Sequence, residues 1–181
     1  RSALEQRPTF AQAHYGLARI LEMQTNYSSA AHHYSNALVA NPTLHPARLG
    51  YGVVLGERGR WAESVSNLTL YVASNTNSGI GHFQLGLALA KRGDGKAAIA
   101  QLERAVELRP RDAATADALA RMLATSPEAG LRNGSRAVSL ATRACSPLES
   151  ARAEHLDTLA AAYAENGAFD DALKAAKQAL A

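Results

Sequence analysis

The sequence repeats itself every 34 residues, and this period constrains the fold more than any other feature of the chain. Residues of one class return at that spacing in several separate series. The clearest series are Pro8, Pro42, Thr76 and Pro110; Leu17, Tyr51, Leu85 and Leu119; Ala18, Gly52, Gly86 and Ala120; and Leu21, Leu55, Leu89 and Leu123. Chance does not keep several independent series in register over three steps, so the chain is built from tandem units.

Each unit reads as two amphipathic helices, as the third unit illustrates. Its predicted helices cover 79–92 and 96–109, with a glycine-containing break at 92–95 between them. Pro110 ends the second helix, since proline cannot continue the backbone hydrogen-bond ladder. Apolar and small residues fall at helical spacing in both segments: Leu85, Gly86, Leu89, Ile99, Leu102, Ala105 and Val106.

Composition narrows the possible classes of protein. Hydrophobic residues make up 47% of the 181 residues, which is enough for a sizeable core, and the net charge of +3 is too small to indicate a polyanionic partner. No apolar run approaches the roughly 20 residues of a membrane-spanning helix. Cys145 is the only cysteine, so an internal disulfide and a cysteine-based metal site are excluded.

The repeated columns resemble the tetratricopeptide repeat (TPR) family over nearly the whole chain. The matching residues are Leu85, Gly86, Gly93, Ala98, Ala105 and Pro110 in the third unit, and Ala30, Tyr34, Ala37 and Pro42 in the first. The resemblance implies an all-α fold, a right-handed superhelical solenoid of antiparallel helix pairs. It also implies a concave groove, lined by the first helix of each repeat, that binds another protein.

On this grid the chain is expected to be a single array. Residues 1–10 are predicted to be the closing helix of a preceding repeat, so the parent protein is expected to carry further repeats upstream. The predicted repeats occupy 11–44, 45–78, 79–112, 113–152 and 153–181, and the fourth contains an inserted turn at 126–133. Such turns are similar to those of many bacterial TPR arrays, which favours a bacterial protein of the cytoplasm or periplasm.

No set of residues indicates catalysis or a cofactor. His32 and His33 are adjacent on a helix and point about 100° apart, and no carboxylate or cysteine completes a metal site around them. The sequence Gly-Asp-Gly-Lys at 93–96 lacks the spacing of a phosphate-binding loop and is better explained as a turn. We therefore expect a protein that is not an enzyme and that binds no metal or cofactor.

The resemblance places the partner-binding surface on the inward side of the first helices. The predicted binding residues are Tyr15, Arg19, Leu49, Val53, Ile80, Phe83, Leu87, Lys91 and Arg121. Leu49, Val53, Phe83 and Leu87 are expected to form an apolar strip flanked by the basic residues. Leu17, Leu55, Leu85 and Leu89 are instead assigned to buried columns. The strip suits a peptide with hydrophobic anchors and some acidic residues.

Three functions remain, of which a protein- or peptide-binding scaffold is favoured. The second is the recognition arm of a larger enzyme, such as a glycosyltransferase or envelope protein, whose catalytic domain lies outside this sequence. The third, RNA binding, is disfavoured because the inward residues are too apolar and irregular to read bases, so no nucleic-acid partner is expected. The chain ends lack a polar cap, which predicts end-to-end self-association.

Overall fold

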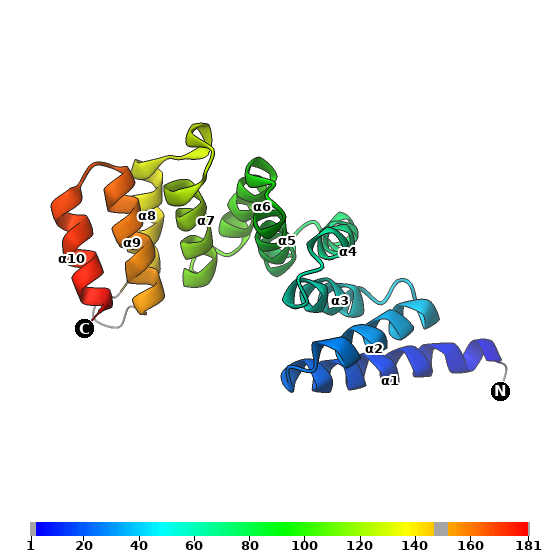
Figure 1. Cartoon of the computed structure of the whole chain (residues 1–181). Helices are drawn as coiled ribbons and strands as arrows, with labels where there is room; N and C mark the ends of the chain where they lie inside the picture. Colours follow the sequence, from blue (N-terminus) through cyan, green and yellow to red (C-terminus); the bar gives the residue numbers. More distant parts are fainter. Residues whose placement is uncertain (1–2, 147–151, 181) are drawn as a thin grey trace. The chain divides into compact units, whose positions relative to one another are not determined.

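The computed structural model of the protein describes residues 3–146 and 152–180. Over these ranges the chain forms ten α-helices, one short 3-10 helix (η1) and no β-strand (Figure 1). The elements are α1 (Ala3–Met23), α2 (Tyr27–Ala40), α3 (His45–Glu57), α4 (Trp61–Ser74), α5 (Gly79–Arg92), α6 (Gly95–Leu108), α7 (Ala113–Thr125), η1 (Ala129–Leu131), α8 (Gly134–Ala144), α9 (Ala153–Glu165) and α10 (Phe169–Ala179). Among the helices described, none is long and apolar enough to cross a membrane.

The break between the two helices of a repeat is a turn through one residue of positive φ. Gly59, Gly93 and Gly167 hold this place with φ of 72°, 97° and 77°, and Thr25 holds it in the first repeat with φ of 57°. Glycine adopts this conformation without steric cost, so the recurring glycine determines where the first helix stops. After Gly59 and after Gly167, the next backbone amide donates to the carbonyl five residues earlier, over 2.9 Å in both cases.

The chain divides into two compact units, unit 1 (residues 1–92, with α1 to α5) and unit 2 (residues 93–181, with α6 to α10). The helices that open four of the predicted repeats begin at His45, Gly79, Ala113 and Ala153, the first residue of each predicted repeat. The boundary between the units follows the first helix of the third repeat. The division into repeats and the continuity of one array across both units stay predictions.

The predicted closing helix at residues 1–10 is wrong as a separate element. Helix α1 runs without interruption over 21 residues from Ala3 to Met23, so residues 3–10 are its first turns. Pro8 is the sixth residue of α1, beyond the N-terminal amides that lack an intrahelical acceptor, and as a proline it donates no backbone hydrogen bond to the helix. Pro42 and Pro110 differ because each follows a completed helix, α2 or α6.

The core of unit 1 lies between α1, α2 and α3. Its buried members are mostly small: Ala11, Ala18, Ala30, Ala31, Tyr34, Ala37, Leu44, Ala47 and Val54. The alanines let α1 and α2 pack closely. Leu17 departs from the predicted buried column and is 42% exposed, whereas Leu55 is fully buried. Among the described helices α1 packs chiefly against α2, and Leu17 lies outside the core that these helices form.

The inserted turn of the fourth repeat is held in unit 2 by hydrogen bonds. The Arg132 guanidinium donates through Nη1 to the Ser126 carbonyl at 3.1 Å and through Nε to Glu165 at 3.1 Å. The Asn133 side chain accepts from the Arg136 amide at 3.0 Å and so caps the N-terminus of α8. Because Glu165 ends α9, the insertion is fixed against the neighbouring repeat.

Candidate functional site

A groove of about 230 Å³ opens in unit 1, where α1, α3 and α5 lie next to the second helix α2. Its lining residues are Tyr15, Arg19, Glu22, Tyr34, Pro46, Leu49, Gly50, Val53, Ile80 and Gln84. The set contains apolar side chains from three helices and one arginine. This groove (hereafter the unit 1 groove) is the candidate binding site.

The floor of the unit 1 groove depends on a close approach between α2 and α3. The Tyr34 side chain is fully buried and lies against Gly50, where a Cβ atom would come within 2.6 Å of the tyrosine hydroxyl oxygen. Only glycine leaves room for the phenol ring at this point. Leu49 and Val53 are half-buried on the same face of α3, and Ile80 of α5 is 40% exposed. Apolar surface is therefore accessible above a closed floor.

Polar contacts fix one cation at the edge of this apolar surface. Arg19 donates through Nη1 to the Tyr15 hydroxyl at 3.3 Å, and its Nε lies 3.8 Å from a Glu22 oxygen. The Tyr34 hydroxyl donates to the same Glu22 carboxylate. Its burial, and then the bond to Glu22, raise the pKa of Tyr34, so the phenol stays protonated and remains a donor.

The guanidinium of Arg19 can still form hydrogen bonds with a ligand despite these contacts. The hydrogen bond to Tyr15 raises the pKa of Arg19, which keeps the guanidinium charged. Its side chain is 56% exposed, and the Glu22 contact at 3.8 Å is too long for a hydrogen bond. A guanidinium carries five N–H donors in a planar fork that matches a carboxylate. Arg19 can therefore donate hydrogen bonds to a carboxylate that enters the groove.

Five of the nine predicted binding residues line the unit 1 groove: Tyr15, Arg19, Leu49, Val53 and Ile80. Phe83 and Leu87 lie half-buried on α5 outside this lining, and Lys91 is exposed in the last turn of the same helix. Arg121 belongs to unit 2. A binding role for these last four residues stays a prediction.

Sequence analysis missed a second groove, of about 310 Å³, between α7 and α9 of unit 2. It is lined by Arg121, Thr125, Glu154, Asp157, Thr158 and Ala161. Arg121 donates to the buried Asp117 carboxylate at 2.6 Å. Asp157 corresponds in the repeat to Leu49, but the inserted residues move it six positions beyond the 34-residue grid. Asp157 would have been identified as an inward residue if the predicted grid had included that six-residue shift.

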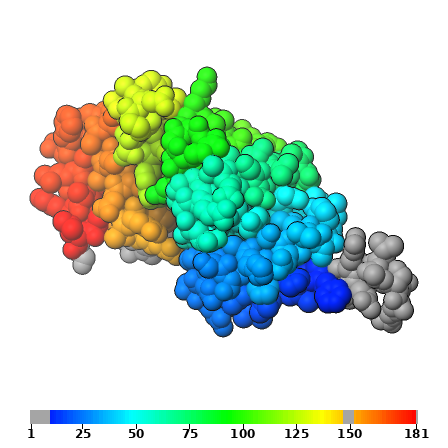
Figure 2. Space-filling model, turned by 45° about the vertical axis from the view of Figure 1, so that its right-hand side comes forward, coloured from blue at the N-terminus to red at the C-terminus, as the bar shows by residue number. Residues whose placement is uncertain are grey.

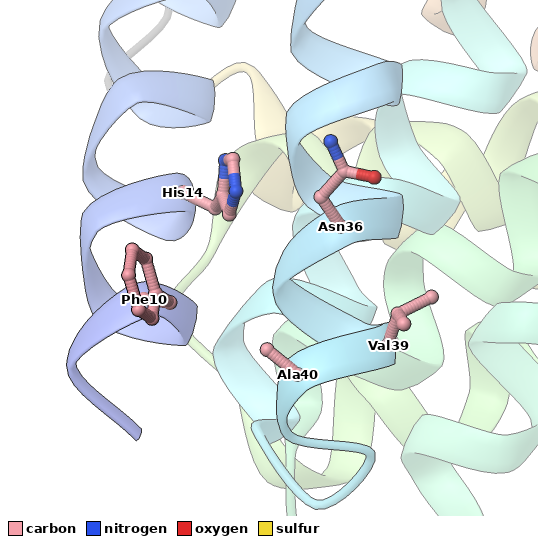
Figure 3. A pocket seen from close by; sticks show the side chains of 5 residues that line it. All are labelled: Phe10, His14, Asn36, Val39 and Ala40. Atoms are coloured by element: carbon pink, nitrogen blue, oxygen red, sulfur yellow. The ribbon is translucent and has the colours of Figure 1, made fainter. Parts of the chain in front are cut away.

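A third hollow, of about 580 Å³, lies between α1 and α2 and is shown in Figure 3. Phe10 and His14 reach it from α1, and Asn36, Val39 and Ala40 from α2. Phe10 is 57% and Val39 is 80% exposed, so the hollow is a shallow surface with two apolar edges. It has no charged side chain in its lining.

The histidines beside this hollow join α1 to α2. Nδ1 of His14 lies 3.0 Å from Nδ1 of His33, the two rings stack with centroids 5.2 Å apart, and His32 meets His33 edge-on. One ring nitrogen must donate and the other accept, so the contact tolerates one proton between the two nitrogens but not two. Burial, followed by the charges of His14 and His32, lowers the pKa of His33.

Acid should therefore weaken the packing of α1 on α2. A histidine with a lowered folded-state pKa contributes stability above its unfolded pKa of about 6.5, and the contribution is lost as pH falls through the folded value. We expect the urea midpoint of unit 1, followed by the fluorescence of Trp61 on α4, to fall between pH 7.5 and pH 5.5. The fall should be smaller in His14→Gln and unchanged in His45→Gln, which leaves the His14–His33 contact intact. Equal falls in all three proteins would contradict this role.

Other reactive groups in the described part of the chain are arranged for structure. No group of three or more His, Cys, Asp or Glu residues there is placed to hold a metal ion. Cys145 is buried at the end of α8, and this burial raises the pKa of its thiol. The thiol is therefore held in its protonated, weakly nucleophilic form.

Solved structures with a similar fold cover almost the whole chain. A crystal structure of MamA is 21% identical, with 94% of this chain and 90% of that chain covered and a TM-score of 0.78. YrrB, described as a TPR protein with an unusual peptide-binding site, is 21% identical, with 92% of this chain and 83% of that chain covered and a TM-score of 0.74. TTC0263, a thermophilic TPR protein in Thermus thermophilus, is 20% identical, with 94% of this chain and 90% of that chain covered and a TM-score of 0.71.

These likenesses and the repeated helix pairs define the class: the protein has an all-α TPR fold. At this level of identity the likeness to MamA, YrrB and TTC0263 concerns the fold alone. No protein-family model and no curated protein sequence matches the chain.

Proposed function

We propose that the protein is a binding scaffold that holds a peptide segment of another protein in the unit 1 groove. One observation carries the proposal: apolar side chains line a groove that has one partly exposed arginine at its edge. Accessible apolar surface of this kind commonly marks an interaction site. The peptide-binding site ascribed to YrrB, which shares the fold, supports a peptide as the ligand class.

The chemistry of the groove selects the kind of peptide. Leu49, Val53 and Ile80 can bury an aliphatic or aromatic anchor, worth roughly 1.5–3 kcal/mol for a fully buried side chain. Arg19 can form a forked pair with an Asp or Glu carboxylate of the same segment. We therefore propose a segment with an apolar anchor and an acidic residue close to it. The positive charge of Arg19 disfavours a cation of the peptide at that place.

Recognition fits this groove better than catalysis does. Its ionisable side chains hold one another, since Tyr34 donates to Glu22 and Arg19 donates to Tyr15. These contacts define shape and charge at fixed positions and keep the tyrosine protonated. A preorganised surface of this kind increases affinity by reducing the ordering cost of binding.

Selection from a random peptide library displayed on phage tests the proposal. Peptides enriched on the 181-residue chain should combine an apolar and an acidic residue, and isothermal titration should then give their affinity for variants. We expect Val53→Asp to weaken binding about tenfold or more, because a charge replaces apolar surface in the groove. Leu70→Asp is the control, since Leu70 is exposed on α4 outside the groove.

Circular dichroism should show equal helical content in both variants. Enriched peptides that bind Val53→Asp and the unaltered chain equally well would contradict the groove assignment. A library that yields no enriched peptide would count against peptide binding itself.

Removing the charge of Arg19 should reduce peptide affinity less than Val53→Asp does. Arg19→Gln removes the cation while leaving the apolar surface intact. We expect a modest loss of affinity, expressed mainly as slower association and a weaker dependence on salt concentration. Surface plasmon resonance at two salt concentrations measures both quantities. An unchanged salt dependence would show that Arg19 does not meet the acidic residue.

A further inference from the structure

The second groove, between α7 and α9, is hereafter called the unit 2 groove. Figure 2 shows α9 in orange beside α10 in red, and α9 packs against α7 and α8 as well. Both walls of the groove therefore belong to helices of one compact unit. The lining residues come from α7 and α9: Arg121, Thr125, Glu154, Asp157, Thr158 and Ala161.

The unit 2 groove is the counterpart of the unit 1 groove in the repeat, but its walls differ in polarity. Once the six inserted positions are counted, Asp157 takes the place of Leu49 and Glu154 takes the place of Pro46. Two carboxylates therefore stand where the unit 1 groove has apolar side chains. The same position in the fold thus presents a different chemistry to a ligand.

The arginines at equivalent positions of the two grooves have different partners. Arg19 donates to the neutral hydroxyl of Tyr15, and its distance to Glu22 is 3.8 Å. Arg121 instead donates directly to the Asp117 carboxylate at 2.6 Å. The charge of Arg121 is therefore offset by a carboxylate in contact with it, and the cation that marks the unit 1 groove is largely neutralised here.

The remaining carboxylates give the unit 2 groove a negative charge toward solvent. Asp157 is exposed, and no ion pair or hydrogen bond within the described residues involves its side chain. Glu154 lies 3.3 Å from Arg152, but both side chains are more than half exposed, and a pair in that setting is weak. The lining therefore favours a cationic ligand.

A buried carboxylate oxygen beside the groove lacks a donor. Asp117 is 5% exposed and lies on the same side of α7 as Arg121 and Thr125, which follow it by four and eight residues. Its Oδ2 accepts from Arg121, but its Oδ1 is buried and receives no hydrogen bond from any described residue. Buried carboxylate oxygens normally have a donor. The Arg121 side chain is 56% exposed, so it has room to turn aside and admit one.

We propose that the unit 2 groove binds a lysine or arginine side chain of a protein segment. The ammonium or guanidinium group pairs with Asp157 and Glu154 and supplies the donor that Asp117 lacks. The apolar stem of such a side chain packs against Ala161 and the methyl group of Thr125. This site is separate from the unit 1 groove, and the proposal does not rest on it.

Selection from the random peptide library on the Val53→Asp chain tests the proposal. That variant impairs the unit 1 groove and leaves unit 2 unaltered. The unit 2 groove offers less apolar surface, so its peptides should bind more weakly and emerge when the other groove is impaired. The enriched peptides should carry a lysine or arginine, and replacing that residue by glutamine should abolish measurable binding.

Isothermal titration of an enriched peptide in the same background identifies the carboxylate that holds it. Asp157→Asn should weaken binding about tenfold or more, because it removes a charge without changing the size of the side chain. Asp170→Asn is the matched control, since it removes the same charge at an exposed residue of α10 outside the groove.

Arg121→Gln should have the opposite effect and strengthen binding of the same peptide by about threefold or more. The substitution removes a like charge from the groove and frees the Asp117 carboxylate for the ligand. Circular dichroism should show that each variant keeps its helical content.

Four outcomes would overturn the proposal: enrichment of no peptide, enrichment of peptides without a basic residue, equal affinities of Asp157→Asn and Asp170→Asn, and weaker binding by Arg121→Gln. The last outcome would indicate that Arg121 itself holds the ligand. Binding in the unit 1 groove is measured on the unaltered chain with peptides of the other kind, so either groove assignment can fail while the other stands.

Discussion

Leu119→Ala is expected to destabilise unit 2 by about 3 kcal/mol, because the substitution leaves a cavity at a fully buried position. Leu119 lies on α7, which packs against α6, α8 and α9, so neighbouring helices hold the cavity open. Urea denaturation measures the loss. Since each repeat contacts mainly its neighbours, hydrogen exchange should accelerate more in α7 to α9 than in α1 to α3.

Leu70→Ala is the matched control for this prediction. The same side chain is removed, but Leu70 is 55% exposed on α4, and we expect a change within about 0.5 kcal/mol. A loss of stability in Leu119→Ala no larger than in Leu70→Ala would show that α7 is not packed as described.

Gly134→Ala is expected to destabilise unit 2 by about 1–3 kcal/mol through overpacking. Gly134 begins α8 beside the end of α9, where an added Cβ atom would come within 2.7 Å of the Asn166 nitrogen and 2.9 Å of the Glu165 carbonyl carbon. Backbone atoms cannot rotate away as a flexible side chain can, so the two helix ends must separate. Thermal unfolding followed by circular dichroism measures the effect.

The inserted turn supplies the control for this substitution. A Cβ atom at Gly130 would meet nothing within 4 Å. Gly130→Ala should therefore be neutral or stabilise the chain by up to about 1 kcal/mol, through the lower entropy of the unfolded state. Equal losses in Gly130→Ala and Gly134→Ala would contradict the close contact between α8 and α9.

The helical fold could be predicted from the sequence because local and periodic features agree. The glycines at 59, 93 and 167 place the turns, and the 34-residue spacing places the helices between them. The extent of α1 was not predictable in this way. Pro8 occupies the same grid position as Pro42 and Pro110, and only the continuous helix shows that it lies inside an element. The exposure of Leu17 was not predictable either, since the repeat pattern puts it in the same series as the buried Leu85 and Leu119.

The candidate site was predictable in part. Inward positions four residues apart on the first helices identified Tyr15, Arg19, Leu49 and Val53. The floor of the groove could not be predicted, because it requires the Tyr34 ring of a second helix to fit against Gly50 and reach Glu22. Such contacts join residues that are distant in sequence and belong to different series of the repeat.

The position of a bound peptide measures the central claim most directly. Amide chemical shifts of the labelled 181-residue chain, recorded with and without a peptide enriched by selection, report which helices contact the ligand. Binding in the unit 1 groove predicts the largest changes around Arg19 on α1, Leu49 and Val53 on α3, and Ile80 on α5. Changes centred instead on the hollow between α1 and α2 near Val39, or on α7 and α9, would contradict the claim.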